Sequence, residues 1–166
     1  IRAAGVDMTL QPAANAIDAA DVTGDGRADI IATLIGEGVD VALLVGRAEW
    51  ASAYDLASDA DVSVGVGNQD HGARIVPDMD GDGLADVVVA EHDARTVHVY
   101  PGGADLAARL ARPEAAAWSV GGVTDTFDVQ AMDLTGDGLA ELVLDRTAVF
   151  FGGRPHAGAY DVDDPE

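Results

Sequence analysis

The chain has 166 residues, 48% of them hydrophobic, and this size and composition indicate one folded domain rather than a disordered segment. Its formal net charge is −21, which disfavours nucleic acid and anionic membranes as partners because like charges repel. The absence of cysteine excludes a disulfide scaffold and a thiolate site, and no run of residues is long and apolar enough for membrane insertion.

A nine-residue acidic stretch occurs three times, beginning at residues 21, 78 and 133. Each copy places side-chain oxygens at positions 1, 3, 5 and 9 and glycines at positions 4 and 6. Carboxylates crowded this closely repel one another, and a hard dication removes that cost. Calcium takes about six to eight oxygen ligands, so three copies of one pattern predict three Ca²⁺ sites. The glycine at position 6 is expected to adopt a positive φ, which lets the loop wrap an ion.

The EF-hand is the obvious competing interpretation of such a stretch. Its loop opens in the same way but requires a glutamate at position 12 and flanking helices. Here position 12 lies inside an apolar run in every copy and is occupied by Ala32, Val89 and Leu144. The sequence therefore excludes an EF-hand at all three places.

Short apolar runs recur at equivalent points around the three stretches. They are rich in Val, Ile and Leu and bounded by Gly, Asp or Pro, which favours strands over helices. Because they are apolar at consecutive positions, both faces of each strand are expected to be covered. The runs are 16–20, 30–35, 41–46 and 61–66 in the first unit, 73–76, 87–90, 97–103 and 116–120 in the second, and 128–132, 142–144 and 148–153 in the third.

The links between the third and fourth runs differ among the units. The link 104–115 is rich in alanine and interrupted by Pro113, so it is expected to contain one short helical turn. Residues 153–161 instead follow the pattern of residues 46–55, which relates the third unit to the first.

Four short antiparallel strands repeated about every 55 residues predict the blades of a β-propeller. The expected fold class is therefore all-β, a single repeat domain over 1–166 with blades at 13–66, 67–121 and 122–166. The third blade lacks its last strand, and 1–12 is a candidate closing strand. Propellers close with about four to eight blades, so three blades predict a partial propeller or a ring completed by another copy. A homodimer would give a six-bladed ring.

The sequence resembles the FG-GAP repeat of integrin α-subunit propellers and their bacterial relatives. The resemblance covers nearly the whole chain and rests on the acidic stretch followed by ADIIATLI or ADVVVAE, and on LLVGR and VFFGGR; the middle VHVYPGG resembles the related VCBS repeat. It implies that each stretch is a Ca²⁺ loop joining the first two strands of a blade. The implied ligands are side chains at positions 1, 3, 5 and 9 and the carbonyl at position 7: Asp21, Thr23, Asp25, Arg27 and Asp29; Asp78, Asp80, Asp82, Leu84 and Asp86; Asp133, Thr135, Asp137, Leu139 and Glu141.

Three departures from the family pattern matter. Thr23 and Thr135 stand where the family usually has Asp or Asn, and Glu141 stands where it usually has Asp. The second loop thus carries one carboxylate more than the others and is expected to bind Ca²⁺ most tightly. The Phe-Gly pair of the family name survives only at Phe151-Gly152.

No catalytic constellation is recognisable: the chain has no Gly-x-Ser-x-Gly elbow, no phosphate loop and no closely spaced histidine pair. The expected function is a Ca²⁺-stabilised, non-catalytic binding or adhesion module with a protein or carbohydrate partner. It is expected to be extracellular, at the cell surface or periplasmic, where calcium levels suit sites of modest affinity. Two alternatives stay open, the propeller scaffold of a secreted polysaccharide lyase or hydrolase and a spacer in a large surface protein. Trp50 and Trp118 are expected to pack between blades rather than to stack on sugars.

Overall fold

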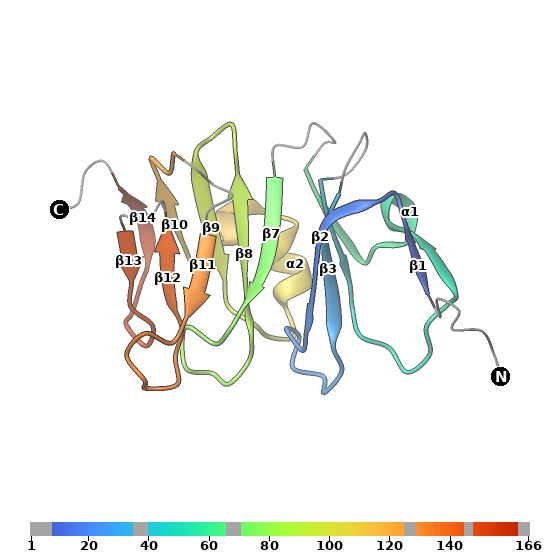
Figure 1. Ribbon diagram of the computed structural model, residues 1–166, viewed down its shortest axis with the longest axis horizontal. Helices are drawn as coiled ribbons and strands as arrows, with labels where there is room; N and C mark the ends of the chain where they lie inside the picture. Colours follow the sequence, from blue (N-terminus) through green and yellow to red (C-terminus); the bar gives the residue numbers. More distant parts are fainter. Residues whose placement is uncertain (1–7, 35–39, 66–70, 125–128, 145–147, 163–166) are drawn as a thin grey trace.

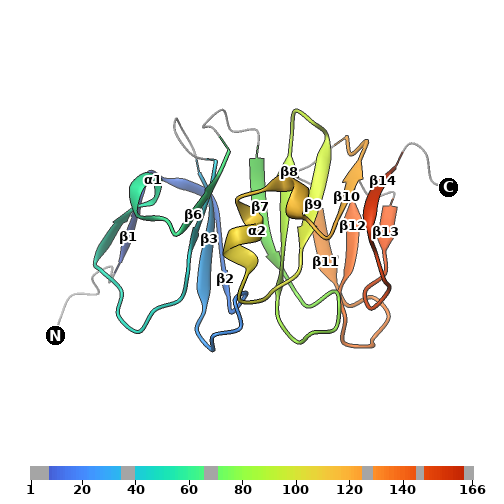
Figure 2. The same ribbon diagram turned by 180° about the vertical axis from the view of Figure 1, so that it is seen from behind.

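The computed structural model describes residues 8–34, 40–65, 71–124, 129–144 and 148–162, which form an all-β partial propeller. Three small antiparallel sheets stand side by side in chain order, and Figures 1 and 2 show them from opposite sides. We call these sheets blades 1, 2 and 3. Blade 1 contains β2 (Ala14–Ala20), β3 (Asp29–Leu34), β4 (Val41–Leu44) and β6 (Val62–Val64); blade 2 contains β7 (His71–Val76), β8 (Asp86–Glu91), β9 (Thr96–Tyr100) and β10 (Trp118–Gly121); blade 3 contains β11 (Val129–Met132), β12 (Glu141–Leu144) and β13 (Ala148–Phe150).

These strands coincide with the apolar runs of the sequence, so the predicted all-β class is confirmed. The differences lie at strand ends: β7 begins two residues earlier than expected, at His71. Residues 35, 66 and 128 of the predicted runs and residues 1–7 of the candidate closing segment lie outside the described part of the chain. The exact blade boundaries stay predictions.

The links after the third strands of blades 1 and 3 each form a strand that pairs in parallel with a neighbouring strand. In blade 3 this strand is β14 (Gly158–Asp161), which adds to β10 and makes the sheet of blade 2 five-stranded. In blade 1 it is β5 (Ala53–Asp55), which pairs with β1 (Thr9–Gln11). A short helix, α1 (Leu56–Asp59), follows β5, and the Asp55 carboxylate accepts a hydrogen bond from the Ala57 N–H at 3.0 Å at its N-terminus. The similarity between residues 46–55 and 153–161 therefore corresponds to one shared structural role.

The link of blade 2 is helical instead. It contains α2 (Leu106–Leu110) and the 3₁₀ turn η1 (Pro113–Ala115), which confirms the helical turn expected in this segment. Leu106 and Leu110 are buried and pack with Val62 and Val64 of β6. Helix α2 thus covers the outer strand of blade 1.

The candidate closing segment 1–12 contributes β1, whose partner is β5 rather than β13. Figure 1 places β1 and β13 at opposite ends of the molecule, so β1 does not lie beside blade 3. Blade 3 has three strands within the described residues, and the expected lack of a fourth stays a prediction.

The core consists of apolar layers between the blades. One layer joins blades 1 and 2 and includes Ile31, Leu43 and Val87, and another joins blades 2 and 3 and includes Val88 and Leu142. All four residues of β4 and all but the last of β8 are buried, as expected for strands covered on both faces.

Trp118 packs in the layer between blades 2 and 3. Its ring centroid lies 5.0 Å from that of Phe150 and 6.0 Å from that of Tyr160, so this tryptophan is a packing residue as predicted. Trp50 packs edge-on against Tyr54 at 5.7 Å. The two tryptophans are not structural equivalents, because His156 stands against Tyr160 as Trp50 stands against Tyr54.

Candidate metal centre

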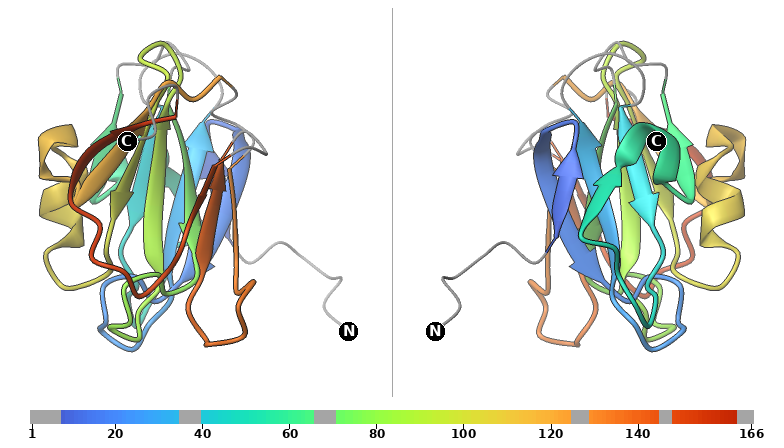
Figure 3. Two further views of the ribbon diagram at one scale, coloured as in Figure 1. Left: turned by 90° about the vertical axis from the view of Figure 1, so that its left-hand side faces the viewer. Right: turned by 90° about the vertical axis from the view of Figure 1, so that its right-hand side faces the viewer.

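The three acidic stretches form loops along one edge of the blades, each joining the first strand of a blade to the second (Figure 1). Figure 3 shows the loops at the lower edge from both ends of the molecule. We call them loop 1 (residues 21–29), loop 2 (78–86) and loop 3 (133–141). Position 9 of each loop is the first residue of the second strand, namely Asp29, Asp86 and Glu141. The strands therefore fix one end of each candidate ligand set.

The carboxylate at position 1 is held in the same way in every loop. One oxygen accepts the N–H of the glycine at position 4, at 2.7 Å in loops 1 and 2 and 2.6 Å in loop 3. The other accepts the N–H of the glycine at position 6, at 2.8, 2.8 and 3.0 Å. All six of these glycines have φ between 78° and 91°, which confirms the positive φ expected at position 6. The backbone thus turns around the position 1 carboxylate.

The carboxylate at position 9 is buried in every loop and accepts the N–H of position 2. The distances are 2.9 Å from Val22 to Asp29, 2.8 Å from Met79 to Asp86 and 2.6 Å from Leu134 to Glu141. This bond closes the loop, because it joins its second residue to its last.

The carboxylate at position 5 accepts the N–H of position 7 at 2.8, 2.8 and 2.9 Å in loops 1, 2 and 3. The side chain at position 3 differs between the loops, as the sequence implied. The Asp80 carboxylate of loop 2 accepts the N–H of Asp82 at 3.0 Å, whereas loops 1 and 3 carry hydroxyls at this point. Whether the carbonyl at position 7 is a ligand stays a prediction.

Loop 2 gathers the largest group of carboxylates. Single oxygens of Asp78, Asp80 and Asp86 lie within 4.8 Å of one another. Burial raises the pKa of Asp86 to about 6, hydrogen bonds from the N–H groups of Gly102 and Met79 oppose this rise, and the charges of Asp80 and Asp78 add to it. A buried carboxylate next to two others is a fit for a dication, which would favour its charged form.

In loop 3 a different feature suits a cation, namely a buried carboxylate oxygen without a partner. The Oε1 atom of Glu141 is buried and has no hydrogen-bond partner among the described residues. Buried polar atoms without a partner are rare and costly, and a metal ion is one of the few ways to satisfy an oxygen of this kind.

Sequence reasoning missed a partner of the position 9 carboxylate. In loops 1 and 2 its second oxygen accepts the N–H of the glycine after the third strand, at 2.6 Å from Gly46 and 2.9 Å from Gly102. A Cβ on Gly46, Gly102 or Gly152 would lie within 3 Å of the carbonyl oxygen at position 8 of the loop. This close approach gives a physical reason for the glycine of the Phe-Gly pair, even where the phenylalanine is absent. The available signal was the glycine or glycine pair that closes each third run, namely Gly46, Gly102-Gly103 and Gly152-Gly153.

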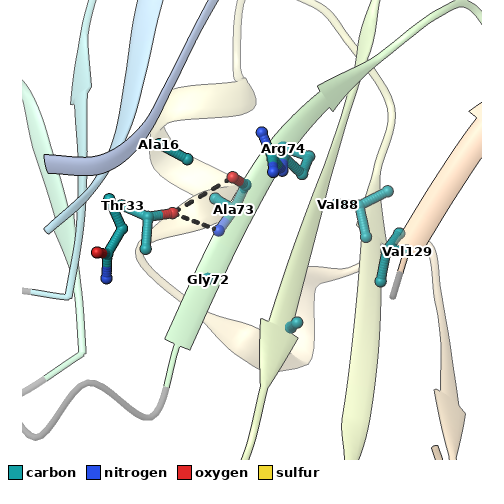
Figure 4. Close-up of a pocket in the computed structure, with 9 residues that line it drawn as sticks. Ala16, Thr33, Gly72, Ala73, Arg74, Val88 and Val129 are labelled. Atoms are coloured by element: carbon teal, nitrogen blue, oxygen red, sulfur yellow. Dashed lines mark hydrogen bonds between the residues drawn. The ribbon is translucent and has the colours of Figure 1, made fainter. Parts of the chain in front are cut away.

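A separate pocket of about 200 Å³ opens where the first strands of the three blades, β2, β7 and β11, come together (Figure 4). Thr33 of β3 lies in its wall, where its hydroxyl accepts the Ala73 N–H at 2.9 Å and donates to the Ala73 carbonyl at 3.3 Å. Small and aliphatic residues make most of the remaining wall, and Arg74 adds one cation. This pocket is a junction between blades, and it contains none of the acidic loop residues.

No helix in the described part of the chain is long and apolar enough to cross a membrane. Comparison with curated proteins and with solved structures gave no match to this chain. The family model of the FG-GAP-like repeat matches residues 78–144, which run from position 1 of loop 2 to the end of β12. Residues 78–144 are therefore an FG-GAP-like repeat.

Proposed function

We propose that the chain is a calcium-stabilised, non-catalytic binding or adhesion module of FG-GAP type that works outside the cytoplasm. The observation that carries the proposal is the repeated loop geometry: three times, a buried carboxylate at position 9 and a backbone-held carboxylate at position 1 are part of one nine-residue turn. Such a donor set suits a hard cation with oxygen ligands. Calcium bound there would neutralise clustered negative charge and join the first two strands of each blade.

The proposed role of calcium is structural. A ligand that binds only the folded protein stabilises it by about 2.7 kcal/mol per site at one hundred times its dissociation constant. Three such sites would match the total stability of a typical domain, which is about 5–15 kcal/mol. Millimolar calcium outside the cytoplasm would fill sites of modest affinity, and this supports the proposed location.

Calorimetric titration and thermal unfolding with and without a chelator test the proposal. We expect calcium binding at several sites and a large fall in Tm when calcium is removed. Asp82→Ala should lower the number of sites by one, whereas Asp93→Asn, at an exposed acid outside the loops, should leave it unchanged. An identical melting curve with and without chelator would rule out structural calcium.

The proposed partner is a protein or a carbohydrate. Binding to a glycan array without release of products would support a binding module. Cleavage of a uronic-acid polymer would support the alternative, a scaffold of a polysaccharide-acting enzyme.

We also propose that a second copy completes the ring, giving a homodimer with six blades. In blades 1 and 2 the third strand pairs with a fourth, β4 with β6 and β9 with β10, whereas β13 pairs with β12 alone among the described strands. Leu134 and Val149 of blade 3 are 53% and 43% exposed, which leaves apolar surface for another blade to cover. The mass in solution, measured by light scattering with and without calcium, tests this assembly, and a monomer in both conditions would contradict it.

A further inference from the structure

Loops 1 and 2 are each contacted by the blade that follows them in the chain. The residue at position 7 of the next loop lies against the glycine at position 4: a Cβ placed on Gly24 of loop 1 would meet Leu84 Cδ1 at 3.1 Å. A Cβ placed on Gly81 of loop 2 would likewise meet Leu139 Cδ2 at 3.8 Å. Successive loops therefore pack through an aliphatic side chain of one and a glycine of the other.

Backbone hydrogen bonds join the same elements. The Gly103 N–H of blade 2 donates to the Val22 carbonyl of loop 1 at 2.8 Å, and the Gly153 N–H of blade 3 donates to the Met79 carbonyl of loop 2 at 2.7 Å. The Ala140 N–H also donates to the Asp78 carbonyl at 2.8 Å. The contact between a loop and the next blade is thus polar as well as apolar.

The residue at position 2 is hydrogen-bonded both to its own loop and to the following blade. The N–H of Met79 donates to the Asp86 carboxylate of its own loop, while its carbonyl accepts from Gly153 of the next blade. Val22 makes the equivalent pair of bonds with Asp29 and with Gly103. The position 9 carboxylate and the following blade therefore hold opposite ends of one short segment.

We propose that the blade after loop 1 and the blade after loop 2 position the calcium ligands of those loops, so that the affinity of loop 2 depends on Leu139 of blade 3 and that of loop 1 on Leu84 of blade 2. The proposal rests on calcium binding by the loops, as proposed above. A loop held in its binding geometry loses less conformational entropy when the ion binds. Because coupling is reciprocal, calcium in a loop also strengthens the attachment of the next blade.

Calcium titration of the full chain, followed by NMR at the glycine amides of positions 4 and 6, reads each loop separately. Those N–H groups donate to the position 1 carboxylate, so their resonances should shift when their own loop binds. We expect Leu139→Ala to weaken loop 2 by about fivefold or more, the lower end of typical coupling between sites. Leu139→Val should give a smaller loss, and it keeps the test valid if the alanine variant unfolds.

Arg27→Ala is the matched control, because Arg27 occupies position 7 of loop 1 and should leave loops 2 and 3 unchanged. Leu84→Ala should weaken loop 1. A loss confined to loop 3 in Leu139→Ala, or an equal loss in all loops, would overturn the coupling while leaving calcium binding intact. Failure of the unmodified chain to bind calcium would overturn both proposals.

Discussion

Loops 2 and 3 share a sequence pattern and a backbone turn but differ in their surroundings. In loop 2 both oxygens of the position 9 carboxylate have backbone donors, whereas Glu141 in loop 3 leaves Oε1 without a partner. Position 2 is 5% exposed in loop 2, as Met79, and 53% exposed in loop 3, as Leu134. The loop sequence thus sets the local turn, whereas the following blade buries position 2 of loop 2, and position 2 of loop 3 stays exposed.

The largest expected difference between the loops concerns position 2. Met79→Ala removes a buried side chain from the layer between blades 2 and 3 and should cost about 2–5 kcal/mol of unfolding free energy. Leu134→Ala, at the exposed equivalent, should cost less than about 0.5 kcal/mol in the monomer. Urea unfolding of both variants measures the gap, and equal losses would contradict the difference in packing.

The next largest effect is the pH dependence of the calcium-free protein. The folded-state pKa of Asp86 is raised from 3.8 to about 6, so folding favours its protonated form. Its stabilising contribution is complete below pH 3.8 and is lost as pH rises through 6, by about 3 kcal/mol at roughly 1.4 kcal/mol per pKa unit. Urea unfolding in chelator between pH 4 and 7 should show this loss.

Asp86→Asn should flatten the pH profile in that window, and Asp93→Asn should leave it steep. Calcium should reverse the slope, because the ion favours the charged carboxylate. A slope unchanged by Asp86→Asn would assign the pH dependence to other acids of this highly negative chain.

A smaller effect is expected from the charge at position 3. Loop 2 should be the last to release calcium to a chelator, because Asp80 gives it one carboxylate more than the other loops. Thr135→Asp should raise the affinity of loop 3 by roughly tenfold, which corresponds to about 1.4 kcal/mol. Chelator competition read at the glycine amides measures both, and loop 3 emptying last in the unmodified chain would contradict the order.

The smallest effect concerns the buried oxygen of Glu141. Glu141→Asp gives loop 3 the residue of loops 1 and 2, whose second oxygen accepts a glycine N–H. If the shorter side chain reaches Gly152 in the same way, the calcium-free protein should gain about 1 kcal/mol, the net value of one hydrogen bond. Thermal unfolding in chelator is the measurement, and a fall in Tm would show that the longer side chain is better packed.

Most of the fold could be predicted because the repeat makes equivalent residues visible. The three loops, the strands of each blade and the helical turn near Leu106 all follow from spacing, apolar runs and turn residues. Local backbone hydrogen bonds hold the carboxylates at positions 1, 5 and 9 of each loop. Among the described residues, however, the carboxylates that come within 4.8 Å of one another are those at positions 1, 3 and 9 of loop 2, and position 5 is not part of that group.

Contacts between units could not be predicted in the same way. A repeat shows which residues are equivalent but not which neighbour they meet, so the pairing of β14 with β10 and the packing of Leu84 on Gly24 were missed. The roles of Gly46 and Gly102 were missed for the same reason, since their N–H groups reach the position 9 carboxylate from more than a dozen residues away along the chain. The placement of β1 beside β5, away from blade 3, also depends on such long-range pairing.

The link of blade 2 forms a helix where the links of blades 1 and 3 form a strand, and this difference has a consequence for aggregation. Exposed strand edges recruit foreign strands, and natural sheets often mask them with another strand or a helix. The chain uses both solutions: β14 occupies the margin of β10, and α2 lies over β6. A foreign strand would have to displace the hydrogen-bonded strand β14 to reach the edge of β10. To reach the edge of β6 it would have to displace only a helix that packs through Leu106 and Leu110. Loosening α2 should therefore uncover the edge of β6 and make this chain more prone to aggregate.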